Sequence, residues 1–111
     1  MLLNRTITSS RPQVTTDAEG VDVNAWNAAE IIDEGVPASI QQMTAHAIAE
    51  FKRRNDVDVD YEIFTRQPLS AIVDDRITDD LNDNYEVKFP CEDMAGRGVM
   101  FCTYCRKIKG S

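Results

Sequence analysis

Hydrophobic and polar residues alternate along this chain with two different periods, and each period predicts its own kind of element. Trp26, Ala29 and Ile32 recur at intervals of three, and Gly35 follows them. An apolar face with this spacing, ended by a residue that readily adopts a positive φ, is typical of a short helix. We therefore expect a helix over residues 25–34.

A longer helical pattern runs from Pro37 to Arg54. Proline suits a first helical turn, and the basic residues 52–54 suit a last turn because they oppose the negative end of the helix dipole. The apolar positions recur at three and four residues, as on one face of a helix. They are Val36, Ile40, Met43, Ala47, Ile48 and Phe51.

The period then changes to two. Between Val57 and Phe64 apolar residues alternate with acidic ones, which predicts a strand with one buried and one mostly wet face. Three carboxylates, Asp58, Asp60 and Glu62, are then expected on the outer face of this strand.

Pro68 begins a second long helical pattern. Its apolar stripe is formed by Leu69, Ile72, Val73, Ile77 and Leu81. The opposite face of this expected helix carries Asp74, Asp75, Asp79, Asp80 and Asp83. Like charges three and four residues apart on a helix repel one another, and Arg76 is the only basic residue nearby to relieve them.

The C-terminal part of the chain predicts a hairpin. Residues 85–89 alternate again, residues 90–98 are typical of a loop, and the run from Val99 to Ile108 is β-branched and aromatic enough to be the return strand. At the other end, residues 1–20 are polar, and we expect an irregular N-terminal segment with an edge strand over residues 5–8.

The expected order is therefore helix, helix, strand, helix, strand, strand. A strand, helix and strand in succession normally cross over with their two strands parallel, and the last strand would return as an antiparallel hairpin. The fold class that follows is α+β: a small mixed sheet of three to four strands with two to three helices packed on one face. Residues 21–111 would form this single domain.

The charge of the chain narrows the choice of partner. The net charge is −7 and the isoelectric point is near 4.6. Between Asp56 and Asp93 there are 12 acidic residues and three basic ones, whereas Met94 to Ser111 holds four basic residues and no acid. Surfaces that bind phosphate are built from Lys and Arg, so direct binding to nucleic acid or to an anionic membrane is not expected.

A basic protein surface is the more natural partner, and a nucleic-acid-handling protein would offer one. The residues expected to meet it are Asp58, Asp60, Glu62, Asp74, Asp75, Asp79, Asp80 and Asp83. On a helix, carboxylates four residues apart lie about 5 to 6 Å from one another, which is tolerably close to the spacing of DNA phosphates. In size and charge the chain resembles the small acidic inhibitors that phages encode, some of which imitate DNA.

Three cysteines suggest a second hypothesis, a small interaction module stabilised by zinc. Cys102 and Cys105 form a CxxC, and Cys91 would supply a third thiolate. If the segment around them is a regular strand, however, Cys102 and Cys105 point to opposite faces and act as small buried hydrophobic residues. The aspartates beginning at Asp56 lack the Gly and Glu positions of a calcium loop.

No catalytic pattern emerges, so the chain is predicted not to be an enzyme and to need no cofactor or metal. His46 is its only histidine, and nothing in the sequence places a nucleophile beside it. An odd number of cysteines and no secretory leader favour reduced thiols and a cytoplasmic location, or the host cytoplasm if the protein is viral. A monomer and a homodimer both remain open.

Overall fold

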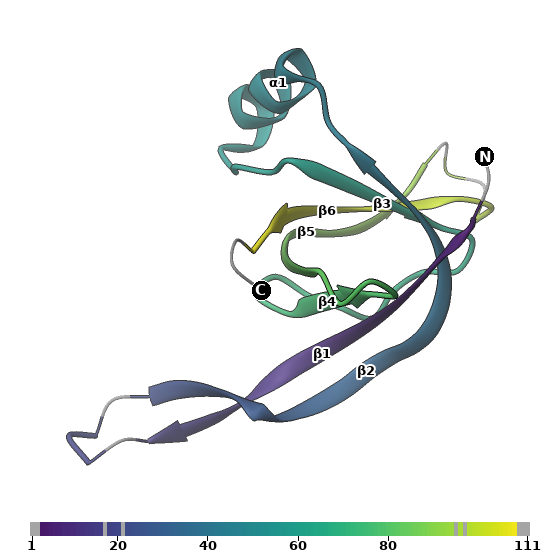
Figure 1. Cartoon of the computed structure of the whole chain (residues 1–111). Helices are drawn as coiled ribbons and strands as arrows, with labels where there is room; N and C mark the ends of the chain where they lie inside the picture. The colour runs from purple at the N-terminus through teal and green to yellow at the C-terminus, as the bar shows by residue number, and fades with distance from the viewer. Residues whose placement is uncertain (1–2, 17, 21, 95, 97, 109–111) are drawn as a thin grey trace.

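The computed structural model describes residues 3–16, 18–20, 22–94, 96 and 98–108. Over these residues the chain forms six strands that close into an antiparallel barrel, with one helix outside it (Figure 1). The elements are β1 (Arg5–Thr16), β2 (Asp22–Gln42), α1 (Ala45–Asn55), β3 (Tyr61–Thr65), β4 (Arg76–Asp79), β5 (Asn84–Asp93) and β6 (Phe101–Lys107). Around the barrel the strands follow the order β1, β2, β3, β6, β5, β4.

The predicted α+β class, with helices on one face of a mixed sheet, is wrong. Each pair of neighbouring strands is antiparallel. The expected parallel pairing of β3 with β5 does not form, because β6 lies between them and pairs antiparallel with both. Side chains of the strands themselves fill the inside of a closed barrel of this size, so no helical layer is needed to cover it.

The helix expected from Pro68 onward is also wrong. Its apolar positions do not share one buried face: Leu69 and Ile77 are buried, whereas Ile72 and Val73 are about half exposed at 52% and 46%. Residues 66–75 form an irregular connection that carries Leu69 and Ala71 into the barrel core, and only Arg76–Asp79 becomes regular, as β4. The spacing that resembled a helix comes from a loop that touches the core at separate points.

The helix expected over residues 25–34 is part of β2 instead. Between the pairs Arg11 with Glu30 and Gln13 with Ala25, a single residue of β1 faces four of β2. That single residue is Pro12, which has no N–H to donate to the neighbouring strand. A bulge of this size interrupts the period of two, and the resulting spacing of three imitates a helical face.

Gly35 does not end a helix either. It lies within β2 with a φ of +63°, beside the register shift between the pairs made by Ile7 and Ser9 of β1. Glycine adopts this left-handed conformation without the steric penalty that a side chain would bring. The positive φ expected at Gly35 is therefore confirmed, but it belongs to a bulge that bends β2 around the barrel.

The helix expected over residues 37–54 is confirmed only in its second half. Residues up to Gln42 still belong to β2 and pair with β3. α1 then begins after Thr44, whose hydroxyl accepts a hydrogen bond from the amide of Ala47, and ends at Asp56, which has a positive φ. The basic residues 52–54 occupy its last turn as predicted.

The predicted C-terminal hairpin is confirmed, since β5 and β6 pair antiparallel. The strand predicted over residues 57–64 forms only from Tyr61, so that Asp58 and Asp60 lie in the connection before β3. At the N-terminus, the segment expected to be irregular forms β1, which is paired on both sides, with β2 and with β4.

Two hydrophobic clusters hold the fold together. The first fills the barrel and includes Ile7, Ile63, Ile77, Val87 and Cys105. The second lies outside the barrel, where α1 packs on β3 and β6 and Phe51 stacks on Tyr104 with ring centroids 4.3 Å apart. Each cluster buries one of the two cysteines of the CxxC.

A two-stranded arm extends away from the barrel (Figure 1). β1 pairs with β4 only through Ile7–Ser10, so among the described residues Arg11–Thr16 pairs with β2 alone. We call Arg11–Thr16 together with Asp22–Glu30 the arm. Such a two-stranded ribbon is only marginally stable alone, so the contacts at its root matter.

Candidate functional site

A row of side chains crosses the outer face of the barrel. Ser10 pairs with Arg76, Arg76 with Glu86, and Glu86 with Arg106, so these four residues lie side by side on β1, β4, β5 and β6. Paired residues of neighbouring strands share a face, and the residues that alternate with them, such as Ile77, point into the core. The row therefore faces outward with alternating charge.

Three pockets follow this row and share lining residues. The Trp26 pocket, about 360 Å³, is lined by Trp26, Asp74, Asp75, Arg76, Glu86 and Ile108. The central pocket, about 410 Å³, is lined by Asp60, Glu86, Arg106, Lys107 and Ile108. The helix pocket, about 250 Å³, is lined by Ile48, Asp58, Val59, Asp60 and Arg106. Each pocket shares two lining residues with the next, so the three lie in a row from the arm to α1, and we call this row of pockets the groove.

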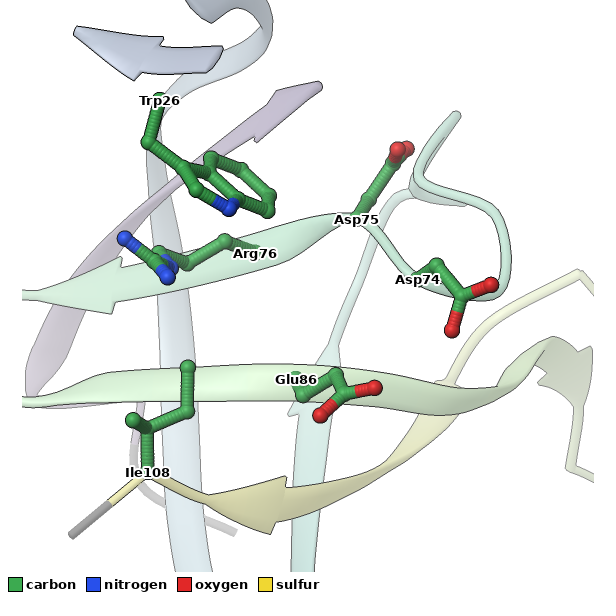
Figure 2. A pocket seen from close by; sticks show the side chains of 6 residues that line it. All are labelled: Trp26, Asp74, Asp75, Arg76, Glu86 and Ile108. Carbon is green, nitrogen blue, oxygen red and sulfur yellow. The ribbon is translucent and has the colours of Figure 1, made fainter. Parts of the chain in front are cut away.

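The Trp26 pocket lies where the arm meets the barrel. Trp26, from the large bulge of β2, covers Arg76 of β4, whose Cζ atom is 4.0 Å from the ring centroid (Figure 2). On the other side of the pocket lie Asp74, which is exposed, and Glu86, which is half-buried and accepts a hydrogen bond from Lys88 at 2.9 Å (Figure 2). The Arg76 Nε atom is buried and has no acceptor among the described residues. A buried donor without a partner costs stability, and a ligand could supply the missing acceptor.

At the other end of the groove, the helix pocket combines apolar walls with carboxylates. Val59 is buried and Ile48 packs from α1 against the outer cluster. The Asp58 side chain is 67% exposed and lies 3.7 Å from Lys52. Asp60 accepts a hydrogen bond from the amide of Lys107 at 3.0 Å, which fixes its position beside β6.

The eight aspartates and glutamates expected to meet a partner do not form one surface. Asp58, Asp60 and Asp74 line the groove at its two ends, and the buried Asp75 also borders the Trp26 pocket. Glu62 lies on β3 opposite Tyr104, and partial burial raises the pKa of its carboxyl group. The other three residues, Asp79, Asp80 and Asp83, belong to the end of β4 and to the connection that follows it.

Two of these carboxylates are buried inside the fold. Asp79 accepts hydrogen bonds from the guanidinium of Arg5, the hydroxyl of Tyr85 and the amides of Leu81 and Asp83, all between 2.9 and 3.0 Å. The helical row of aspartates on which phosphate imitation depended is thus absent from the described residues. The expected repulsion between neighbours is replaced by full hydrogen bonding.

Asp75 is satisfied in the same way. Its two oxygens accept from Nε and Nη2 of Arg11 at 3.1 and 3.0 Å, and one of them also accepts from the amide of Ile72. This two-pronged ion pair raises the pKa of Arg11 and joins the root of the arm to the barrel. Asp80, by contrast, is exposed, and its hydrogen bond from Arg5 lowers the pKa of its carboxyl group.

Three important groove residues escaped the sequence prediction. Trp26 was expected in the buried face of a helix, and Arg76 only as a neutralising charge within the acidic helix. Glu86 carried a usable signal, because the alternation of residues 85–89 places it on the outer face of its strand. Nothing local connects Trp26 with Arg76, which lie 50 positions apart in sequence.

The three cysteine side chains do not lie together at one site. Cys102 and Cys105 belong to different hydrophobic clusters, and the thiol of Cys91 donates to the carbonyl of Leu69. Burial raises the pKa of Cys102 to about 12 and raises that of Cys105 as well. Within the described part of the chain no group of three His, Cys, Asp or Glu side chains is arranged to hold a metal.

His46 lies exposed on α1. Among the described residues, the one helix is too short to span a membrane. No family model matches this sequence, and no curated protein matches it. The class of the protein is therefore taken from its geometry: a small antiparallel barrel that carries a mixed-charge groove on its outer face.

Proposed function

We propose that this chain is a non-enzymatic acidic protein-binding module, and that its groove receives a basic surface of a partner protein. The observation that carries the proposal is the groove itself, which joins three pockets over four strands and ends in exposed carboxylates at Asp58 and Asp74. Pockets with apolar walls and a few convergent polar groups are typical of binding sites.

The overall charge supports the same kind of partner. A net charge of −7 repels acidic partners and raises the association rate of basic ones. In the sequence, residues 17–22 add Asp17, Glu19 and Asp22 without a basic residue. The effect is electrostatic over a long range, and it should therefore weaken as salt is added.

Proteins that handle nucleic acids have surfaces rich in Lys and Arg, so they are the first partners to look for. A module that covers such a surface competes with the natural ligand of that surface, which would make it an inhibitor. The three cysteines are free, as expected in a reducing compartment, and this supports a cytoplasmic location for the interaction.

The test compares proteins retained by the immobilised full chain with those retained by two charge-matched variants. The groove variant is Asp58→Asn with Asp74→Asn. The control variant is Asp56→Asn with Glu34→Gln, which removes two exposed carboxylates that do not line the groove. Both variants change the net charge by the same amount, so a difference between them reports the groove.

We expect a basic protein from the native lysate to be retained by the unmodified chain and by the control variant, and to be lost by the groove variant. Its retention should also fall as NaCl is raised from about 50 to 300 mM, because the Debye length shortens. If both variants retain the same proteins, the groove is not the binding surface and the proposal is wrong.

A further inference from the structure

The arm is interrupted at the same level in both of its strands. In β1 the interruption is Pro12, which has no N–H to donate. In β2 it is the run of residues 26–29, which faces that single residue of β1. Beyond this level, residues 13–16 pair with residues 22–25, and we call these two segments the strap. A ribbon whose two strands are both interrupted at one place can bend there, so this level provides a hinge.

The strap gains little stability from packing. A two-stranded ribbon is only marginally stable in water without a third strand or a covering layer. The described side chains of Gln13, Val14 and Thr16 are exposed, and that of Val14 is 61% exposed. A segment with so few buried apolar contacts opens at a low cost in free energy.

Two contacts of the arm with the barrel lie on different sides of the hinge. On the barrel side, Arg11 donates two hydrogen bonds of 3.1 and 3.0 Å to the buried carboxylate of Asp75. This pair fixes the root of the arm to the barrel. On the other side, Trp26 directly follows the strap residue Ala25 in sequence. Its ring therefore moves with the strap, whereas Arg11 stays in place.

Arg76 has two groups within reach to which its charge is attracted. Its Cζ atom lies 4.0 Å from the centroid of the Trp26 ring. Glu86 is opposite it on β5 but forms its ion pair with Lys88, and Figure 2 shows the Glu86 carboxylate directed away from the guanidinium. Opposite charges directly across an antiparallel pair of strands attract one another. Arg76 is thus bound to the ring in the structure, and Glu86 becomes its partner if the ring moves away.

The contact of Trp26 with Arg76 also has a cost. The Nε atom of Arg76 is buried and has no acceptor among the residues that the structure describes. Water or a carboxylate satisfies this donor once the ring moves away. The attraction between ring and cation and the cost of the unpaired donor are opposing terms of similar size. Opposing terms of similar size are the condition under which a protein populates two conformations.

We propose that the strap is a hinged cover at the Trp26 end of the groove. In the closed position Trp26 lies on Arg76, and in the open position Arg76 is uncovered and pairs with Glu86. Opening brings a second cation beside Glu86 and makes this end of the groove less acidic. The motion goes beyond the proposed function, and its consequence for a partner rests on that function: a basic surface binds more tightly when the strap is closed.

The fluorescence of Trp26 reports the position of the ring, because it is the only tryptophan of the chain. Acrylamide quenching is measured on the full chain without a partner, for Arg76→Gln and for its control Arg66→Gln. Arg66 is exposed and does not line the Trp26 pocket, and both variants remove one positive charge. We expect the ratio of open to closed protein to rise about two- to fivefold in Arg76→Gln, as for the loss of one partly exposed cation–π contact. Quenching should rise with it, and the control should be quenched like the original protein.

Glu86→Gln tests the open position. It removes the carboxylate that pairs with the uncovered Arg76, so the closed position should gain and quenching should fall. Unchanged quenching in this variant would contradict the exchange of Arg76 between Trp26 and Glu86. Thermal unfolding shows whether each variant is folded. Arg76→Lys replaces Arg76→Gln if that variant is not, since Lys keeps the charge and loses the planar group that stacks on the ring.

Hydrogen exchange separates motion of the strap from motion of the ring alone. Strap amides should exchange faster in Arg76→Gln than in Arg66→Gln, and the amides of β3 and β6 should not change. If the ring becomes accessible while the strap amides do not, or if Arg76→Gln is quenched like its control, the hinged cover is wrong and the proposed function stands. If the strap behaves as expected while the groove variant and its control retain the same proteins, the proposed function is wrong and the hinged cover stands.

Discussion

Asp74 and Asp75 are adjacent in sequence and belong to two different regions of the molecule. Asp75, with Asp79, lies in the seam where β1 meets β4, and the side chains of both are at most 3% exposed and fully hydrogen bonded. Asp74, with Asp58, lies exposed in the groove. The same residue type thus stabilises the fold in the seam and remains available to a partner in the groove. Acidic composition alone does not distinguish the two.

The largest effect should come from the seam. Replacing Asp79 with Ala removes the acceptor of four hydrogen bonds and leaves the guanidinium of Arg5 without its buried partner. Breaking a buried ion pair from one side costs about 3 to 5 kcal/mol. Urea denaturation should show a loss of this size in the free energy of unfolding.

Asp80→Asn is the control for Asp79. It removes the other carboxylate that Arg5 contacts, at 2.7 Å, but an exposed one. An exposed ion pair is screened by solvent and contributes little to stability, so the variant should be nearly as stable as the original protein. Equal losses for the two variants would show that the seam is no different from the surface.

A smaller loss is expected from Asp75→Asn. The amide can still accept from one donor but no longer pairs with the charge of Arg11, and about 1 to 3 kcal/mol should be lost. Because Arg11 is at the root of the arm, hydrogen exchange of arm amides should also accelerate. Asp74→Asn should change neither quantity, and a comparable loss there would contradict the division between seam and groove.

Trp26→Ala should have a still smaller effect on stability. The contact of its ring with Arg76 is worth about 0.5 to 1 kcal/mol at a partly exposed site. Trp26→Phe should recover part of this, since a smaller ring still covers the guanidinium. If the ring only holds the arm in place, retention of the partner protein will survive Trp26→Ala, whereas a role as groove wall requires that retention weakens.

A last comparison concerns the reactivity of the cysteine thiols. In the folded protein, the two buried thiols are expected to react with an alkylating reagent at a rate close to zero. With its pKa raised to about 12, Cys102 holds about one thiolate in ten thousand at pH 8, and Cys105 is buried and shifted in the same direction. Iodoacetamide at pH 8 should therefore modify half-buried Cys91 first, as read by mass spectrometry of tryptic peptides. Rapid modification of Cys105 in the folded protein would contradict the closed barrel.

Local signals were sufficient for some elements and insufficient for others. The strand at Tyr61–Thr65 follows from alternation, and the strand at Phe101–Lys107 follows from its β-branched and aromatic composition. The end of α1 follows from its basic last turn. All of these features depend on neighbours in sequence. The bulge of β2 depends on Pro12, and the burial of Asp75 and Asp79 depends on arginines 64 and 74 positions away. Contacts between residues so far apart in sequence leave no periodic pattern from which they could be predicted.

Some residues of the candidate site could likewise be predicted from the sequence, and others could not. Asp58, Asp60 and Asp74 were identified because exposed carboxylates are abundant in the central part of the sequence, although their expected places on a strand and a helix were wrong. The groove itself needs the register of three strands, which brings Arg76, Glu86 and Arg106 into one row. Sequence periodicity predicted a helix where β4 forms, and a helix would not have brought these three residues into one row.

The most direct test of this account measures two properties of one protein, the groove variant with Asp58→Asn and Asp74→Asn. The basic protein that the unmodified chain retains from the native lysate should no longer be retained by this variant, because the variant lacks the two exposed carboxylates. The variant's free energy of unfolding should remain within about 0.5 kcal/mol of the original. Unchanged retention by this folded variant, with the charge-matched control behaving identically, would contradict the central claim that the exposed carboxylates of the groove, Asp58 and Asp74, bind a basic partner.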